Sequence, residues 1–94
     1  MPLYIAVIRE DAGHFNVSFP DVPGLVTAGD NLDDAIEEAI EALEAAGEDW
    51  TNPDGSTGLK SPRSFDELQR DPAFVAAADG ATLVEIEWPV ADND

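Results

Sequence analysis

The feature that most constrains this fold is the unbroken apolar run Leu3–Ile8, with the sequence LYIAVI. The run is rich in β-branched and aromatic side chains and does not alternate with polar residues. A strand of this kind is typical of a position covered on both faces, whereas a half-exposed strand alternates. We therefore expect it at the centre of a sheet, with a helix as one covering layer.

Three more segments have strand character. Residues 15–19 (FNVSF) alternate and follow the turn-like EDAG, which predicts a hairpin with the first strand. Their polar members, Asn16 and Ser18, are expected to point outward, near an open edge of the sheet. Residues 25–28 follow a Pro-Gly pair suited to a type II turn, and residues 81–88 (ATLVEIEW) alternate again.

One long helix is predicted after the third strand. Its apolar positions follow the i, i+3, i+4, i+7 rule and are Leu32, Ala35, Ile36, Ala39, Ile40 and Leu43. Asp30 suits the N-cap, and Gly47 suits the end of the helix. Shorter helices are expected within residues 64–80, where Ser64 and Glu67 form a capping-box pattern.

The element order is therefore β-β-β-α, short helices, then β. We expect an α+β domain: a mixed four-stranded sheet with one long helix and short helical turns packed on one face. The last strand is expected beside the first and parallel to it, through a crossover connection. Pairing at the other edge of the sheet remains an alternative.

Composition limits the possible partners. The 94 residues fit one domain, and 21 acidic residues against four basic ones give a net charge of −17. Such a chain should repel phosphate and anionic lipid, so we expect no direct binding of nucleic acid or membranes. There is no cysteine, no signal-peptide pattern and no apolar segment of the roughly 20 residues that a membrane helix needs. We expect a cytoplasmic protein.

The predicted long helix is unusually acidic. Nine acidic residues and no basic residue lie between Asp30 and Asp49, so no i, i+4 ion pair can form there and like charges repel. One interpretation is an ordinary solvated face. The other is an electrostatic complement to a cationic partner, which would speed association.

The loop Pro20–Gly24 (PDVPG) precedes the third strand. Two prolines and a glycine predict a stiff connection, in which Asp21 bonds to nearby backbone N–H groups. A stiff loop also loses little entropy when a partner docks on it, so a prearranged contact is the second interpretation.

The sequence gives little support for catalysis. The apolar run Leu3–Ile8 carries no carboxylate, Glu85 and Glu87 lack an obvious third metal ligand, and His14 is the only histidine. We predict no catalytic residue, no metal site and no cofactor. Trp50 is interpreted as a lid on the core, and Trp88 as the better candidate for an interface.

The segment Phe19–Leu43 carries a recognisable pattern: FPD-x-PG, then T-x-GD, then a helix that begins with acidic residues and alanine. Tyr4 in the first strand and a proline-bearing loop after the helix add to it. From about Leu3 to Val90 the chain closely resembles the N-terminal domain of HicB-family antitoxins.

This resemblance implies a partial ribonuclease-H-like domain without catalytic activity. Such domains bind and occlude a small basic mRNA-cleaving toxin of the HicA type, and the family usually forms dimers or larger oligomers. Many members also carry a C-terminal DNA-binding module. Because this sequence stops at Asp94, we expect a HicB-like domain over residues 1–90, a polar tail over 91–94, and no such module.

Our first hypothesis is thus an antitoxin that covers the RNA-binding or catalytic face of a HicA-type toxin. The alternatives are an orphan homo-oligomeric acidic interaction module without a toxin, and a weak metal-dependent nuclease. The residues predicted to bind the partner are Pro20, Asp21, Pro23, Asp34, Glu37, Glu38, Glu41 and Trp88.

Overall fold

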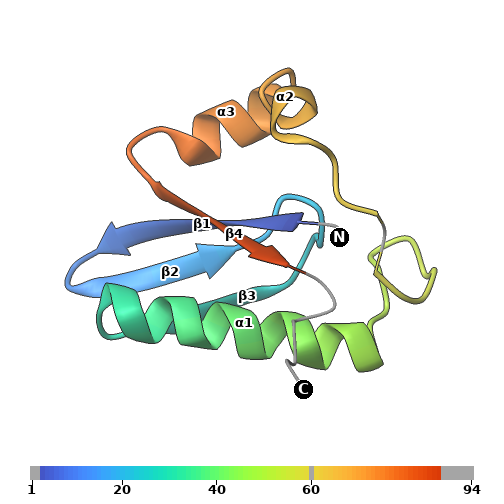
Figure 1. Cartoon of the computed structure of the whole chain (residues 1–94), viewed down its shortest axis with the longest axis horizontal. Helices are drawn as coiled ribbons and strands as arrows, with labels where there is room; N and C mark the ends of the chain where they lie inside the picture. Colours follow the sequence, from blue (N-terminus) through green and yellow to red (C-terminus); the bar gives the residue numbers. More distant parts are fainter. Residues whose placement is uncertain (1–2, 60, 88–94) are drawn as a thin grey trace.

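A computed structural model describes residues 3–59 and 61–87 of the chain. Its elements, in chain order, are the strands β1 (Leu3–Asp11), β2 (His14–Ser18) and β3 (Val26–Gly29), the helices α1 (Leu32–Glu48), α2 (Phe65–Leu68) and α3 (Pro72–Ala78), and the strand β4 (Thr82–Glu87). This order confirms the predicted α+β class and the short helices before the last strand (Figure 1).

The four strands form one sheet in the order β3-β2-β1-β4. β1 is central, as the unbroken apolar run predicts. Residues Ala12 and Gly13 join β1 to β2, and both have positive φ, 55° and 86°. β2 lies between β1 and β3, so the prediction that it lies near an open edge is wrong. The two edges are β3 and β4.

β4 lies beside β1 as predicted, but it runs antiparallel to β1, with Ile8 opposite Thr82 and Leu3 opposite Glu87. The predicted parallel pairing, and with it the mixed sheet, is wrong: all three strand pairs in the described residues are antiparallel. β4 runs antiparallel to β1 because the chain reverses direction a second time between β3 and β4. α1 leads away from the end of β3, and α2 and α3 bring the chain back before β4 begins (Figure 1).

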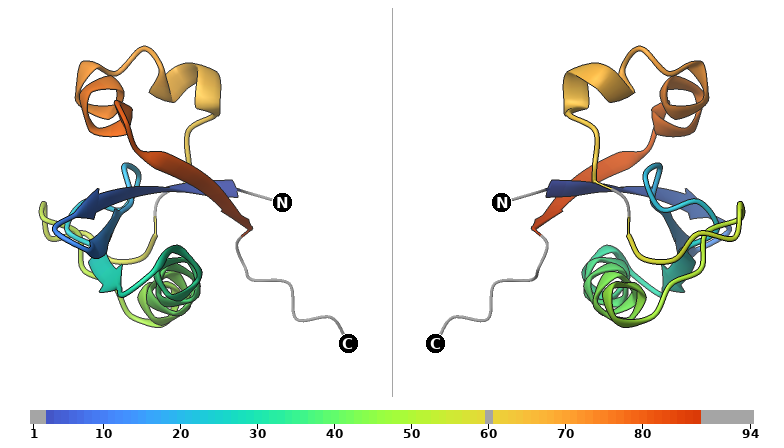
Figure 2. Two further views of the ribbon diagram at one scale, coloured as in Figure 1. Left: turned by 90° about the vertical axis from the view of Figure 1, so that its left-hand side faces the viewer. Right: turned by 90° about the vertical axis from the view of Figure 1, so that its right-hand side faces the viewer.

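That return passes over the opposite face of the sheet, so the prediction that all helices share one face is also wrong. α1 covers one face, and α2 with α3 covers the other (Figure 2). Side chains of β1 alternate between two clusters. Tyr4, Ala6 and Ile8 face α1, whereas Ile5 and Val7 pack against Leu68 and Phe74. β1 is therefore covered on both faces, which is why it lacks polar alternation.

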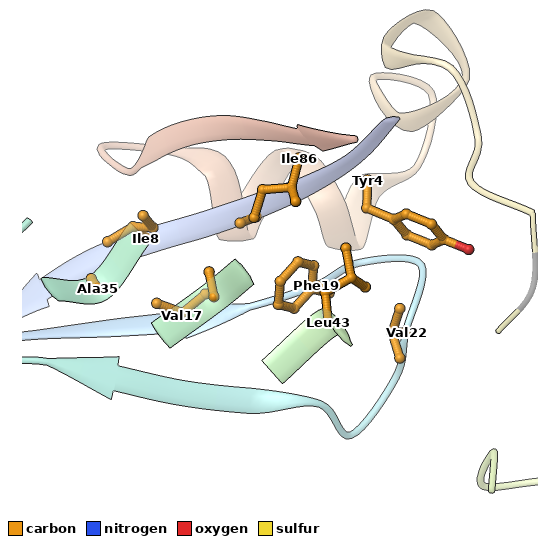
Figure 3. Packing of buried hydrophobic residues seen from close by; sticks show 10 residues of the cluster. Tyr4, Ile8, Val17, Phe19, Val22, Ala35, Leu43 and Ile86 are labelled. Carbon is orange, nitrogen blue, oxygen red and sulfur yellow. The ribbon is translucent and has the colours of Figure 1, made fainter. Parts of the chain in front are cut away.

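The larger cluster lies between the sheet and α1 (Figure 3). It is built from β1, β2, the loop after β2, α1 and β4, and its most buried members are Tyr4, Ala6, Ile8, Val17, Phe19, Val22, Ala35, Ala39, Leu43 and Ile86. The small alanines of α1 let the helix lie close to the sheet.

The helix ends follow ordinary capping chemistry. The N-cap of α1 is Asn31, not the predicted Asp30, and the Asn31 side chain accepts a hydrogen bond from the Asp34 backbone N–H at 2.8 Å. α1 continues one residue beyond Gly47. The predicted capping box of Ser64 and Glu67 is confirmed. Within residues 3–59 and 61–87, none of the helices has both the length and the apolar character that a bilayer span requires.

Candidate functional site

The candidate site is the acidic face of α1, which we define as Asp34, Glu37, Glu38 and Glu41. All four residues are exposed. They line one shallow hollow together with Ala28, Gly29 and Asp30 at the end of β3. The structure therefore brings together the four helix residues that the sequence predicted as partner contacts, and it places them beside a strand.

The opposite face of α1 fixes this orientation. Ala35, Ala39 and Leu43 are fully buried against the sheet, so the acidic residues at the intervening positions must point to solvent. The contact with β3 is especially close at Gly29. A Cβ atom at this position would lie 2.4 Å from the backbone nitrogen of Ala35, so only glycine fits without a shift of α1.

The basic residues that the structure describes do not neutralise this face. The Arg9 guanidinium donates hydrogen bonds of 2.9 Å to the backbone carbonyls of Ala77 and Asp79, at the end of α3. Arg63 pairs with Asp21 and Asp71. No acidic residue of α1 forms an ion pair with a base in the described part of the chain, so the negative charge stays open to a partner.

Asp21 has a different role from the one predicted. Its carboxylate accepts hydrogen bonds from the backbone N–H of Arg63 at 2.9 Å and from the Arg63 Nε at 2.7 Å, and the side chain is only 8% exposed. The prediction that Asp21 bonds to nearby backbone N–H groups is wrong, because its partner lies 42 residues away. The rigid loop is thereby tied to the layer formed by α2 and α3.

Two titrating groups adjoin this ion pair. Burial, and then the nearby Asp21 carboxylate, raise the pKa of the Tyr4 hydroxyl above its ordinary value. Hydrogen bonds from Arg63, and then from the backbone of Ala73, lower the pKa of Asp71. Asp71 also caps α3 through its bond to the Ala73 N–H, at 3.0 Å. The Arg63 guanidinium therefore pairs with two carboxylates, those of Asp21 and Asp71.

The two prolines of the loop after β2 differ in exposure. Pro20 is half-buried and Pro23 is exposed, so the loop offers Pro23 to a partner more than Pro20 or Asp21. Trp88 lies outside the described residues. Trp50 packs against the larger cluster, which confirms its interpretation as a lid on the core, and its indole Nε1 is buried.

The residues considered for catalysis are dispersed. His14 is exposed at the start of β2, and Glu85 is exposed on β4. Among residues 3–59 and 61–87, no three histidine, aspartate or glutamate side chains converge as metal ligands.

The sequence model described as "HicB_like antitoxin of bacterial toxin-antitoxin system" matches residues 3–93. The chain belongs to the HicB-like antitoxin family. The match covers the acidic helix, the proline-bearing loop and all four strands, which confirms the resemblance to HicB antitoxins inferred from residues 19–43.

Two solved HicB structures from Burkholderia pseudomallei are similar to this chain. The N-terminal domain of that antitoxin HicB has 27% sequence identity and a TM-score of 0.61, with 93% of this chain and 96% of that chain covered. The antitoxin HicB itself has 26% identity and a TM-score of 0.62. This HicB-like chain is covered completely but spans 66% of that protein. No curated protein sequence matches the chain significantly.

Sequence reasoning missed Arg63 and Arg9 as organising residues of this HicB-like domain. The signal was their rarity: with four basic residues among 94, each base has many possible acidic partners. Which acid or carbonyl each one meets depends on how α2 and α3 fold back over the sheet, and no local pattern encodes that.

Proposed function

We propose that this chain is an antitoxin that neutralises a small basic mRNA-cleaving toxin of the HicA type by covering its RNA-binding or catalytic face. Membership of the HicB-like antitoxin family supports the antitoxin role. The observation that supports a basic toxin as the partner is the acidic face of α1, which no described base neutralises.

The physical argument is charge complementarity. An enzyme that cleaves RNA must present positive charge to a polyanion, and a dense negative surface both attracts that charge and competes for it. Steering of this kind raises association rates by on the order of 10 to 10³, and salt weakens it. Single exposed ion pairs contribute only about 0–1 kcal/mol, so buried contacts must supply most of the affinity.

The antitoxin would act in the cytoplasm, where mRNA is cleaved, without a cofactor. We also expect a homodimer or a higher oligomer, which light scattering after size-exclusion chromatography would measure. No catalytic step is assigned to the chain.

The first experiment is native purification of the tagged protein from its own host, followed by mass spectrometry of the proteins that co-elute. We expect a small basic protein that cleaves RNA only after this chain is selectively denatured. If the protein elutes alone as an oligomer and no ribonuclease is recovered, the orphan interaction module replaces the antitoxin proposal.

A charge reversal tests the steering argument. Glu37→Lys combined with Glu41→Lys should slow association with the toxin at least fivefold at low salt, with a smaller difference at high salt. The matched control is Glu85→Lys combined with Glu87→Lys, which makes the same charge change at the opposite edge of the sheet. Equal effects of the two double variants would show that net charge, and not the acidic face of α1, sets the rate.

A further inference from the structure

The outer edge of β3 lies next to the acidic face of α1. β3 is the last strand of the sheet on its side, and no described strand pairs with that edge. Its sequence, VTAG, has no proline and no charged residue. Proteins commonly protect exposed strand edges with lysine, proline or a bulge, and an edge without them is a template for another strand.

The register shows which backbone groups face outward. Positive φ at both Ala12 and Gly13 identifies a two-residue type I′ hairpin, so Asp11 and His14 form a hydrogen-bonded pair. Hydrogen bonding alternates along antiparallel strands. Phe15 and Val17 therefore bond to β3, where they lie opposite Gly29 and Thr27. The N–H and C=O groups of the two remaining residues of β3, Val26 and Ala28, point to the open edge.

The surroundings of this edge differ between the two faces of the sheet. On the α1 side, Ala28 and Gly29 share a hollow with the acidic face of α1. On the other side, Val26 and Ala28 border a hollow of mixed character, and Val26 is 68% exposed. Its polar lining consists of the uncharged Asn16, Ser18 and Thr27 together with one base and two acids, Arg9, Glu10 and Asp11. Side chains of an added strand would alternate between these two environments.

We propose that the outer edge of β3 accepts an extended strand of a cationic partner protein. The strand pairs with the backbone of Val26 and Ala28, and its lysine or arginine side chains, at every second position, lie over the acidic face of α1. The proposal rests on the antitoxin function proposed above, because the basic toxin supplies the strand. It adds the place of docking and the pattern of the docked segment.

A second copy of this chain fits the edge less well. Antiparallel pairing of β3 with β3 of another copy requires a two-fold axis perpendicular to the sheet, which places both α1 helices on the same face. Their acidic faces would then meet, and residues 30–49 of each copy contain nine acidic residues and no basic residue. Like charges brought together in this way oppose association, whereas a basic strand removes the repulsion.

Hydrogen exchange measured by NMR tests the edge directly. In the free protein, the amides of Val26 and Ala28 should exchange fast, while those of Thr27 and Gly29 are protected by β2. Binding of the co-purified basic ribonuclease at saturation should slow exchange at Val26 and Ala28 at least tenfold. Unchanged exchange at both residues in the saturated complex would overturn the proposal.

A proline variant provides a second test. Ala28→Pro removes an outward N–H without removing a bond to β2, and it should weaken binding of the ribonuclease at least tenfold. The matched control is Leu83→Pro, since the same alternation across β1 points the Leu83 N–H to the outer edge of β4. This control should change affinity less than twofold. A folded Ala28→Pro variant that binds as tightly as the control would overturn the proposal, and if it does not fold, the exchange measurement decides.

The outcomes separate this inference from the antitoxin function. If the ribonuclease binds without slowing exchange at Val26 and Ala28, and the Ala28→Pro variant binds it as tightly as the control, the antitoxin function stands. The proposal that the edge of β3 accepts a strand is then overturned. If no ribonuclease is recovered, the antitoxin function fails, and an eight-residue peptide that alternates lysine and threonine becomes the probe. That peptide should bind at least fivefold more tightly than a peptide of the same composition with its lysines grouped at one end. The NMR signals of the Val26 and Ala28 amides report the binding of each peptide. Equal binding of the two peptides would overturn the edge.

Discussion

The Arg63 Nε donates a hydrogen bond of 2.7 Å to the Asp21 carboxylate, and this contact joins the loop after β2 to the layer of α2 and α3. The Arg63 side chain also reaches Asp71, at 3.0 Å, at the start of α3. Two parts of the chain that cover different regions of the sheet therefore share one cation.

Arg63→Met should lower the free energy of unfolding by about 2 kcal/mol at neutral pH, because it leaves the 8%-exposed Asp21 carboxylate without its charged partner. The loss is smaller than for a fully buried ion pair because the Arg63 side chain is 38% exposed and solvent screens its charge. Urea denaturation measures the change. Arg70→Met, at an exposed position, is the matched control and should change stability by less than about 0.5 kcal/mol. Equal losses for the two variants would contradict the role given to Arg63.

The pH dependence of stability should reveal the lowered pKa of Asp71. Hydrogen bonds, chiefly from Arg63, hold the folded pKa of Asp71 below its ordinary value of 3.8. Its contribution is therefore fully present above the unfolded pKa and is lost as the pH falls through the folded pKa. The stability difference between the wild type and Asp71→Asn should be constant between about pH 5 and 7 and shrink below about pH 4.

The control for Asp71 is the same substitution in an Arg63→Met background. Without the guanidinium, the pKa of Asp71 rises toward its ordinary value, so the pH-dependent part of the difference should become smaller. Thermal unfolding across the acid pH range measures this pH-dependent part. The four proteins compared are the wild type, the two single variants and the double variant. An identical pH profile in both backgrounds would show that Arg63 does not set this pKa.

Gly29→Ala should destabilise the domain by about 1–3 kcal/mol, because the new Cβ would lie 2.4 Å from the backbone nitrogen of Ala35 and push α1 away from β3. Gly47→Ala is the control, at an exposed position inside α1, where alanine should be neutral or stabilise by up to about 1 kcal/mol. Chemical denaturation measures whether each variant loses or gains stability. A neutral Gly29→Ala variant would mean that α1 can shift without loss.

Glu41→Lys should stabilise the domain at low salt while it weakens partner binding. The new lysine lies four residues after Glu37, the favourable order for a helical ion pair worth about 0.2–0.5 kcal/mol, and it also removes a like-charge repulsion. Thermal unfolding should show a gain that shrinks at about 1 M salt, as screening predicts. Glu41→Gln, which removes the repulsion without adding a pair, should gain less. No gain for either variant would show that the acidic face carries no internal repulsion.

Some of these features could be predicted from the sequence. The apolar run Leu3–Ile8 determined that β1 is central and covered on both faces, because burial on two sides forbids polar alternation. The apolar period of residues 32–43 determined the long helix, and its acidic residues determined that the helix bears an open negative face. Patterns of this kind are local, since the side chains involved are a few residues apart.

The direction of β4 and the place of α2 and α3 could not be predicted in this way. They depend on which face the segment after α1 crosses, and that choice is made by contacts between distant residues, such as Arg63 with Asp21 and Leu68 with Ile5 and Val7. The same holds for Asp21. Its neighbours in sequence suggested a local turn contact, but its hydrogen-bond partner arrives from a segment 42 residues later.

The sequence by itself therefore determined the elements, the central strand, the acidic helix and the family resemblance. Tertiary structure alone decided that the sheet is antiparallel throughout its described strands, that helices cover both of its faces, and that the acidic face of α1 lies beside the open edge of β3. The physical reason is that side-chain periodicity is set within one element, whereas strand direction and neighbouring surfaces are set by the path of the chain between elements.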